Sequence, residues 1–577
     1  MDTKRWALCA SVTLGIALSI GGSLTAGAQN AAGSFAEPYT PAKEAKDLKA
    51  VLFNWMWHMG MLKGEDERDM VASLEYQGKG TVQVDGQPCT LTKFRVSTYY
   101  PTSSQRAQYT CTRANGQTYS NIEVVSGLYA WNEDTPGAEI GPQKGKVTPM
   151  ASSVQERLIR MWASPQGAAK AALAGTTETF WLGPNPGTLF EDGAMKVRNT
   201  SVAWEGGKPV VTFPLPGVAG ATATATLDAK YMTERVVVRH GDNTTEFTYG
   251  DYRDWNNPLN KIEVFHAGKI VERRNGAVVR DLTTVETETG NVYVVAPVPA
   301  SVQRAIQPAA QFPRGVVAKT EPAVDRSAQT PRIAGKPDMT GMWQHTDWIG
   351  RYGRRRCGPT QDEECSRQIN QTEDFELYSP SRYGSFGRPL YKPQYWDKVQ
   401  QLDMWTNKED PVMTCQPLGL PRQGPPRRIY QSADDITFLY TQYADAGGGL
   451  GEFRVIPTDG RKHDEEAEFA NSYYGDTVGH WEGDTLVLDS IGFNDRTWLG
   501  RGGFFHTDQM HIVERFTRQG NTILYEVTVE DPGVLVEPWV LTPRTLVPNA
   551  NPDAKLLPER GNCEVYEDIA EVNQIRH

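Results

Sequence analysis

The sequence predicts a mainly β protein built from two antiparallel β domains. In long stretches apolar and polar residues alternate. This two-residue period is typical of a strand with one buried face. Turn signals such as Asn115-Gly116 and Asn275-Gly276 separate these stretches at hairpin spacing. A chain of 577 residues is too long for one hydrophobic core. A segment rich in proline, alanine and glutamine divides it, so we predict a β domain at 29–299, a linker at 300–336 and a second β domain at 337–577.

The first 28 residues have the pattern of a secretory signal peptide. Lys4 and Arg5 precede an apolar run from Trp6 to Leu24, and Ala26-Gly27-Ala28 supplies the small residues that signal peptidase accepts. A membrane anchor is the alternative, but serine and glycine residues break the apolar run. The residue directly after the expected cleavage point is Gln29 rather than a cysteine, which argues against a lipid anchor. We expect an exported protein, periplasmic or extracellular, without a stable membrane anchor.

Cysteine usage agrees with an oxidising compartment. Of the seven cysteines, Cys9 leaves with the signal peptide, and an even number remains. Proximity favours two disulfides, Cys89 with Cys111 and Cys357 with Cys365. That choice leaves Cys415 and Cys563 to close the C-terminal domain, although other pairings are possible.

Composition limits the class of partner. The formal net charge of −11 disfavours a nucleic acid, because phosphate binding needs a basic surface. The 15 tryptophans and 23 tyrosines suit β-sheet packing first and an aromatic-lined pocket second. An aromatic-lined pocket would accept a small aromatic or apolar ligand. The sequence leaves open whether the chain forms homo- or hetero-oligomers.

The N-terminal half combines two helices with many strands. Apolar residues at three and four residue spacing predict helices at 41–62 and 154–173. Alternation predicts strands at 71–84, 90–98, 106–112 and 122–131, and consecutive antiparallel strands between 202 and 295.

This strand order resembles that of the LolA-like proteins. It includes YGDYRDW from Tyr249 and KIEVFHAGKIVERRNG from Lys261, and the resemblance spans residues 36 to 300. It implies a curved half-barrel that covers helices and holds an apolar ligand.

The C-terminal half predicts an antiparallel barrel. Gly341-Met342-Trp343 opens a run of short strands, as in lipocalin-like barrels. The expected strands lie at hairpin spacing: 436–443, 452–457, 477–482, 485–490, 511–517 and 522–530.

The same half resembles a group of secreted bacterial proteins through several long phrases. These are CQPLGLPR at Cys415, IPTDGRKH at Ile456, VGHWEGDTLVLDSIGFND at Val478, ERFTR at Glu514 and VEDPGVLVEPW at Val529. The resemblance implies turnover of plant-derived aromatics without an organic cofactor, including cleavage of lignin β-aryl ethers.

A hairpin with Gly483-Asp484 as its turn places His480 and Asp489 on one face as diagonal neighbours. A carboxylate there can orient the histidine and raise its basicity, which gives a general base. The alternative is that the acidic residues decorate the turn and His480 hydrogen-bonds a neighbouring strand.

A second group comprises His506, Asp508 and His511. We predict His506 or His511 as the acid or as a hydroxyl binder. The group could instead hold a divalent metal, but its spacing matches no short zinc motif, so we expect no cofactor.

Four further residues are candidates for substrate binding. His463 follows a turn at the mouth of the expected barrel, Trp481 can hold an aromatic ring, and Asn494 and Asp495 follow a strand end. Their structural alternatives are an exposed hairpin and a capped turn.

The leading functional hypothesis is a secreted enzyme that cleaves an ether or related bond in a plant-derived aromatic compound. One alternative is a periplasmic binding or carrier protein for an apolar ligand. Another is an envelope module that recruits a protein partner. Sequence signals of common hydrolases, such as GxSxG and HExxH, are missing.

Overall fold

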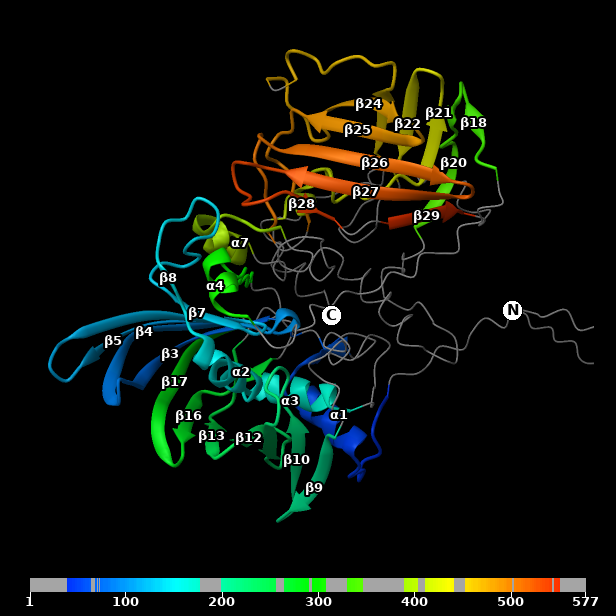
Figure 1. Cartoon of the computed structure of the whole chain (residues 1–577). Helices are drawn as coiled ribbons and strands as arrows, with labels where there is room; N and C mark the ends of the chain where they lie inside the picture. The colour runs from blue at the N-terminus through cyan, green and yellow to red at the C-terminus, as the bar shows by residue number, and fades with distance from the viewer. Residues whose placement is uncertain are drawn as a thin grey trace, which may run out of the picture. The chain divides into compact units, whose positions relative to one another are not determined.

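A computed structural model describes the chain at 39–63, 68–69, 71, 73–176, 199–255, 264–289, 293–307, 329–345, 389–402, 410–440, 452–467, 469–500, 503–541 and 544–549. The expected signal peptide and Cys357, Cys365 and Cys563 lie outside these ranges. The described residues form two large antiparallel sheets within one unit, 37–577 (Figure 1). This confirms the mainly β fold class.

The N-terminal sheet has 13 strands in the order β8-β7-β6-β5-β4-β3-β17-β16-β13-β12-β11-β10-β9. Pairing of β17 with β3 joins the two halves of this segment into one continuous sheet. The strands are β3 (Ser73–Val84), β4 (Gln87–Tyr99), β5 (Ser104–Arg113), β6 (Thr118–Ser126), β7 (Tyr129–Glu133), β8 (Val147–Pro149), β9 (Ser201–Glu205), β10 (Lys208–Pro214), β11 (Thr222–Leu227), β12 (Thr233–His240), β13 (Asn243–Gly250), β16 (Lys269–Arg274) and β17 (Ala277–Thr289).

Three helices pack against one face of this sheet: α1 (Leu48–His58), α2 (Val154–Trp162) and α3 (Pro165–Ala174). Their apolar residues share one core with alternate residues of the strands, among them Trp55, Phe94 and Phe213. We call this the helix face. The intervening strand residues necessarily point to the opposite face, which we call the outer face.

The helix expected at 154–173 is two helices, and the sequence explains the break. Pro165 lacks a backbone N–H and occupies the first turn of α3, while the Ser164 side chain caps that helix by accepting a hydrogen bond from the Gly167 amide. Helix α1 begins later than expected because Asp47 is its N-cap and accepts from the Ala50 amide.

A buried ionic network ties α2 to the sheet. Arg160 of α2 lies 3.0 Å from a carboxylate oxygen of Glu272 on β16 and 2.9 Å from one of Glu156. Arg280 of β17 also contacts Glu272, at 3.6 Å, and Glu123 at 3.2 Å. Charges in such a place are tolerated only when each has a partner.

The C-terminal sheet has ten strands in the order β23-β22-β21-β20-β29-β27-β26-β25-β24, with β28 also paired to β27. Arg454 of β23 hydrogen-bonds Thr477 of β24, so the two end strands approach each other, as in a barrel. The strands are β20 (Gly341–His345), β21 (Arg428–Gln431), β22 (Asp435–Leu439), β23 (Phe453–Pro457), β24 (Asp476–Glu482), β25 (Thr485–Ile491), β26 (His511–Gln519), β27 (Thr522–Glu530), β28 (Trp539–Val540) and β29 (Arg544–Pro548).

Short elements complete the described chain. Two-residue strands pair as β1 (Leu62–Lys63) with β2 (Arg68–Asp69), β14 (Arg253–Asp254) with β15 (Phe265–His266), and β18 (Arg332–Ile333) with β19 (Lys336–Pro337). Two short helices are α4 (Ala300–Ala305) and α7 (Trp396–Gln401), and 3-10 turns occupy Tyr100–Thr102, Ala151–Ser153, Pro393–Tyr395 and Pro411–Thr414.

The segment around the expected domain boundary contacts both cores. Tyr293 and Val295 pack into the core of the C-terminal sheet, whereas Val302 of α4 packs with Val124 and Trp131 of the N-terminal sheet. The expected linker therefore begins with an ordered helix, and the domain boundaries themselves stay a prediction.

Cys89 and Cys111 form a disulfide between β4 and β5. Cys415 is also disulfide-bonded. Within the described ranges, no helix has the length and apolar character that crossing a membrane requires.

The Arg160 network predicts a specific loss of stability in acid. Burial opposes ionisation of Glu272, but Arg160 and Arg280 outweigh it and lower the pKa of this carboxyl from 4.5 to about 2. Because the folded pKa is the lower one, this stabilisation is complete above pH 4.5 and is lost as the pH falls towards 2. Glu272→Gln should therefore lower the free energy of unfolding at neutral pH by about 3 kcal/mol and flatten its dependence between these pH values. Urea unfolding at a series of pH values measures this.

Glu234→Gln provides the control, because Glu234 forms a half-exposed pair with Lys208. This substitution should lower the free energy of unfolding by less than about 1 kcal/mol. If Glu272→Gln and Glu234→Gln lowered the free energy of unfolding equally, the acid sensitivity could not be assigned to the Arg160 network.

Candidate functional site

The predicted β24–β25 hairpin has the expected register. Glu482 faces Thr485, Trp481 faces Leu486, His480 faces Val487 and Val478 faces Asp489. His480 and Asp489 therefore lie on the same face, as the sequence indicates.

Asp489 nevertheless binds other histidines. Its Oδ1 lies 3.0 Å from Nε2 of His463 and 3.1 Å from Nε2 of His511. His480 instead contacts Glu482, two residues along the same strand face, at 3.3 Å. The expected His480–Asp489 pair is thus replaced, because β26 and the loop before β24 bring two nearer histidines to the carboxylate.

Two more carboxylates complete this cluster. Nδ1 of His463 lies 2.8 Å from Asp476, and Nδ1 of His511 lies 3.4 Å from Glu530. We call these five residues the histidine cluster. It lies on the outside of the C-terminal sheet, because the neighbouring residues Ser490 and Ile512 point inwards and are fully buried.

The histidine cluster has the parts of an acid–base site but an open setting. Its side chains are between 22% and 51% exposed, so water competes for every hydrogen bond. Across the residues that the structure describes, no group of three or more histidine, cysteine, aspartate or glutamate side chains is arranged to hold a metal ion.

The remaining predicted site residues lie apart from the cluster. His506 is buried, with Nε2 2.8 Å from the Thr497 hydroxyl and Nδ1 3.0 Å from the Thr507 carbonyl, and burial lowers its pKa. Trp481 packs against the core and has Lys336 above its ring. Asn494 caps a turn by accepting from the Arg496 amide, and Asp495 is exposed. The placement of Asn494 matches its structural alternative, a capped turn.

A polar network inside the C-terminal sheet was not predicted from the sequence. Arg454 is 2.6 Å from Glu514, and both side chains are almost completely buried. Tyr440 and Tyr525 hydrogen-bond the pair, at 3.1 and 2.9 Å. Arg454 occupies an inward position of β23 between exposed Phe453 and Val455. Apolar alternation in the sequence predicts the opposite orientation, with Phe453 and Val455 buried, so it gave no signal for this network.

Two cavities on the outer face of the N-terminal sheet were not predicted from the sequence either. They lie beside α7 and have volumes of about 280 and 330 Å³. Three residues line both: Arg95 of β4, and Asp397 and Gln400 of α7. We call the two cavities together the α7 groove.

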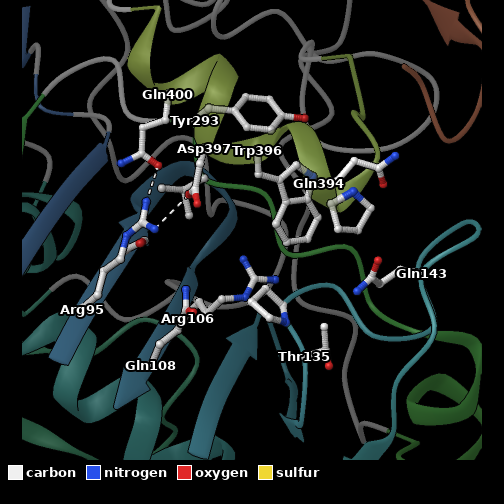
Figure 2. A pocket seen from close by; sticks show the side chains of 14 residues that line it. Arg95, Arg106, Gln108, Thr135, Gln143, Tyr293, Gln394, Trp396, Asp397 and Gln400 are labelled. Carbon is white, nitrogen blue, oxygen red and sulfur yellow. Dashed lines mark hydrogen bonds and ion pairs between the residues drawn. The ribbon is translucent and has the colours of Figure 1, made fainter. Parts of the chain in front are cut away.

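Arg95 divides the α7 groove. Figure 2 shows it reaching from the sheet to α7, where it donates hydrogen bonds of 2.9 Å to both Asp397 and Gln400. Its Nε lies 2.8 Å from Glu75 of β3, a side chain that also accepts from the Ser97 hydroxyl. One guanidinium therefore connects two strands to the covering helix.

The smaller cavity has an aromatic wall. The Arg106 guanidinium lies 4.6 Å from the Trp396 ring, and the two groups are adjacent in Figure 2. Arg106 also donates to the Val295 carbonyl at 3.0 Å and lies 3.4 Å from Glu133. Trp396 is fixed in turn, because its ring nitrogen donates to the Tyr391 carbonyl. The Arg106 guanidinium and the Trp396 ring are therefore both held in position before any ligand binds.

Comparison with known proteins gives little beyond the fold. No model of a protein family matches this chain, and no curated protein matches it. Among solved structures, a lipoprotein-sorting protein domain from Vibrio parahaemolyticus is 11% identical and covers 41% of this chain and 91% of its own, with a TM-score of 0.23. A LolA superfamily protein from Nitrosomonas europaea is 8% identical and covers 42% and 94%, with a TM-score of 0.23.

The histidine cluster predicts a selective change in nuclear magnetic resonance spectra. Asp489→Asn should alter the ring ¹⁵N shifts of His463 and His511, because each loses a carboxylate partner, and should leave those of His480 unchanged. Glu482→Gln is the matched control and should alter His480 alone. A response of His480 to Asp489→Asn would restore the pairing first expected from the hairpin.

Proposed function

We propose that this chain is an exported binding protein that takes a small molecule in the α7 groove. The proposal rests on the groove itself, in which two adjoining cavities are lined by side-chain amides and by guanidinium and aromatic groups. The guanidinium groups and the Trp396 ring are held in place by their own partners. Concave sites with a few fixed polar groups are the usual form of a small-molecule site. The cavities together fall within the typical range of about 300 to 1,000 Å³.

The lining favours binding over catalysis. None of the described residues that line the groove is histidine or cysteine. Its carboxylates are already engaged: Glu75 and Asp397 by Arg95, and Glu286 by the Gln77 amide at 2.9 Å. A general base needs a free proton acceptor within reach of the substrate, and these groups do not provide one.

Ether cleavage stays a prediction without a supporting observation. That hypothesis requires His480 as the general base and Asp489 as the carboxylate that orients it. In the structure Asp489 contacts His463 and His511 instead. The histidine cluster lies on an open outer surface of the C-terminal sheet, and none of its residues lines either described cavity. Such a position does not exclude water from a reacting bond.

A second candidate ligand position is the helix face of the N-terminal sheet. There the alanines of α3, including Ala168 and Ala172, pack in the same core as Ala223 and Ala225 of β11. This apolar layer is covered by three short helices rather than by a second sheet. The apolar ligand that the LolA-like strand order implies would bind in this layer.

The groove can be tested by filling it. Gln108 of β5 lines the smaller cavity, so Gln108→Trp should occupy the space and weaken ligand binding at least about tenfold. The measurement is ligand-observed nuclear magnetic resonance with a library of small polar, aromatic and aliphatic compounds, followed by titration calorimetry of the compounds that bind.

Lys93→Trp is the matched control. Lys93 is exposed on the neighbouring strand β4 and lines neither cavity, so binding should be unchanged. Compounds that bind wild type and both variants equally would place the site elsewhere. Aliphatic compounds with that behaviour would favour the helix face.

A further inference from the structure

The charges along the α7 groove are balanced before any ligand enters. Its guanidinium groups, on Arg95 and Arg106, face the carboxylates of Glu75, Asp397 and Glu133 at 2.8, 2.9 and 3.4 Å. An anionic ligand would have to compete with these carboxylates, and a cationic ligand with these guanidinium groups. A ligand that displaced Glu75 or Glu133 would leave a protein charge without its partner in a buried place, which is unfavourable. The Asp397 carboxylate is 72% exposed, so water can solvate it and its loss as a partner costs little. Charge balance therefore favours a neutral ligand.

The groove is also rich in uncommitted amides. Six glutamines line it: Gln77, Gln108, Gln143, Gln394, Gln400 and Gln401. Gln77 and Gln400 hydrogen-bond Glu286 and Arg95. Within the described part of the chain, no side-chain hydrogen bond engages the other four amides. Each amide offers donors and an acceptor, so together they match a ligand that carries many groups able both to donate and to accept.

The walls between these amides are apolar. Trp396, Tyr293, Pro136 and Pro393 line the smaller cavity. Ring faces and proline rings pack against C–H groups, while the amides beside them satisfy polar groups on the edges of the same ligand.

We infer that the α7 groove binds a short neutral saccharide, a ligand that presents hydroxyl groups at its edges and C–H groups on its ring faces. This inference rests on the proposed binding function and adds the ligand class. Hydroxyls donate and accept at once, as the glutamines do, and carry no charge that would disturb the ion pairs of Arg95 and Arg106. Arg95 lies where the two cavities meet, so a disaccharide would place one ring on each side of it.

The test compares three disaccharides of similar size with the purified full chain. The probes are cellobiose, its uronic acid counterpart and the glucosamine dimer, together with a pool of other neutral disaccharides; binding is followed by saturation-transfer nuclear magnetic resonance and calorimetry. At least one neutral disaccharide should bind at least about tenfold more tightly than either charged counterpart, because only a charged ligand must disturb a paired group.

The variant Gln108→Leu/Gln394→Leu should weaken that binding at least about tenfold, since it removes two amides while keeping side-chain size. Gln83→Leu, at an exposed position of β3 outside both cavities, should leave it unchanged. Thermal unfolding of each variant, which should match wild type, separates loss of binding from loss of folding.

The remaining outcomes separate the two proposals. Tighter binding of the acid or the amine would overturn the neutral ligand class and retain a binding site in the groove. Binding of aromatic compounds that Gln108→Trp blocks, without any saccharide, would also overturn the ligand class alone. If no compound binds in a manner sensitive to Gln108→Trp, both the ligand class and the proposed function fail.

Discussion

The N-terminal sheet depends on the pairing of Arg160 with the carboxylates around it. This side chain lies between α2 and the helix face, where an unpaired charge would cost several kcal/mol. Glu272, Glu123 and Glu156 surround it, and they come from β16, β6 and α2 itself. Because these strands lie far apart in the sheet order, the network requires the sheet to curve around the helix. Apolar packing of α1 and α3 then fills the rest of the concavity.

Burial of one sheet face determines what the other face can carry. Strand residues alternate between the faces, so Phe94 and Val96 enter the core while Arg95 and Ser97 point outwards. On most sheets such residues would meet water. Here α7 and the chain around Tyr293 cover part of the outer face, and the polar side chains beneath them become the lining of the α7 groove. The groove thus exists because α7 and the chain around Tyr293 cover only part of the polar outer face.

Local patterns predicted most elements, because alternation and turn residues act over a few positions. The strand expected at 122–131 is an exception, since a turn at 127–128 divides it into β6 and β7. The β24–β25 register followed from Gly483-Asp484 alone. The break between α2 and α3 could also have been read from Ser164-Pro165, since a proline suits a first turn and disrupts a helix interior.

The candidate site could not be predicted in the same way. Arg95 and Asp397 are 302 positions apart, and nothing near either residue in the sequence indicates their contact. The expected His480–Asp489 pair did not form, for a related reason. His480 was chosen because the hairpin brings it near Asp489, but His463 and His511 reach Asp489 from a loop and from β26. Neighbours supplied by tertiary structure outweighed the diagonal neighbour within the hairpin.

The paired charges of the α7 groove explain how a partly polar cavity stays open. A cavity lined only by apolar groups tends to collapse, because its lining gains contacts by closing. Arg95 opposes that closure, since Glu75 behind it and Asp397 and Gln400 in front of it fix the separation between β3, β4 and α7. Arg106 of the neighbouring strand β5 packs against the Trp396 ring and so fixes the position of that ring. The groups that hold the groove open are therefore occupied, and discrimination among ligands is left to the amides between them.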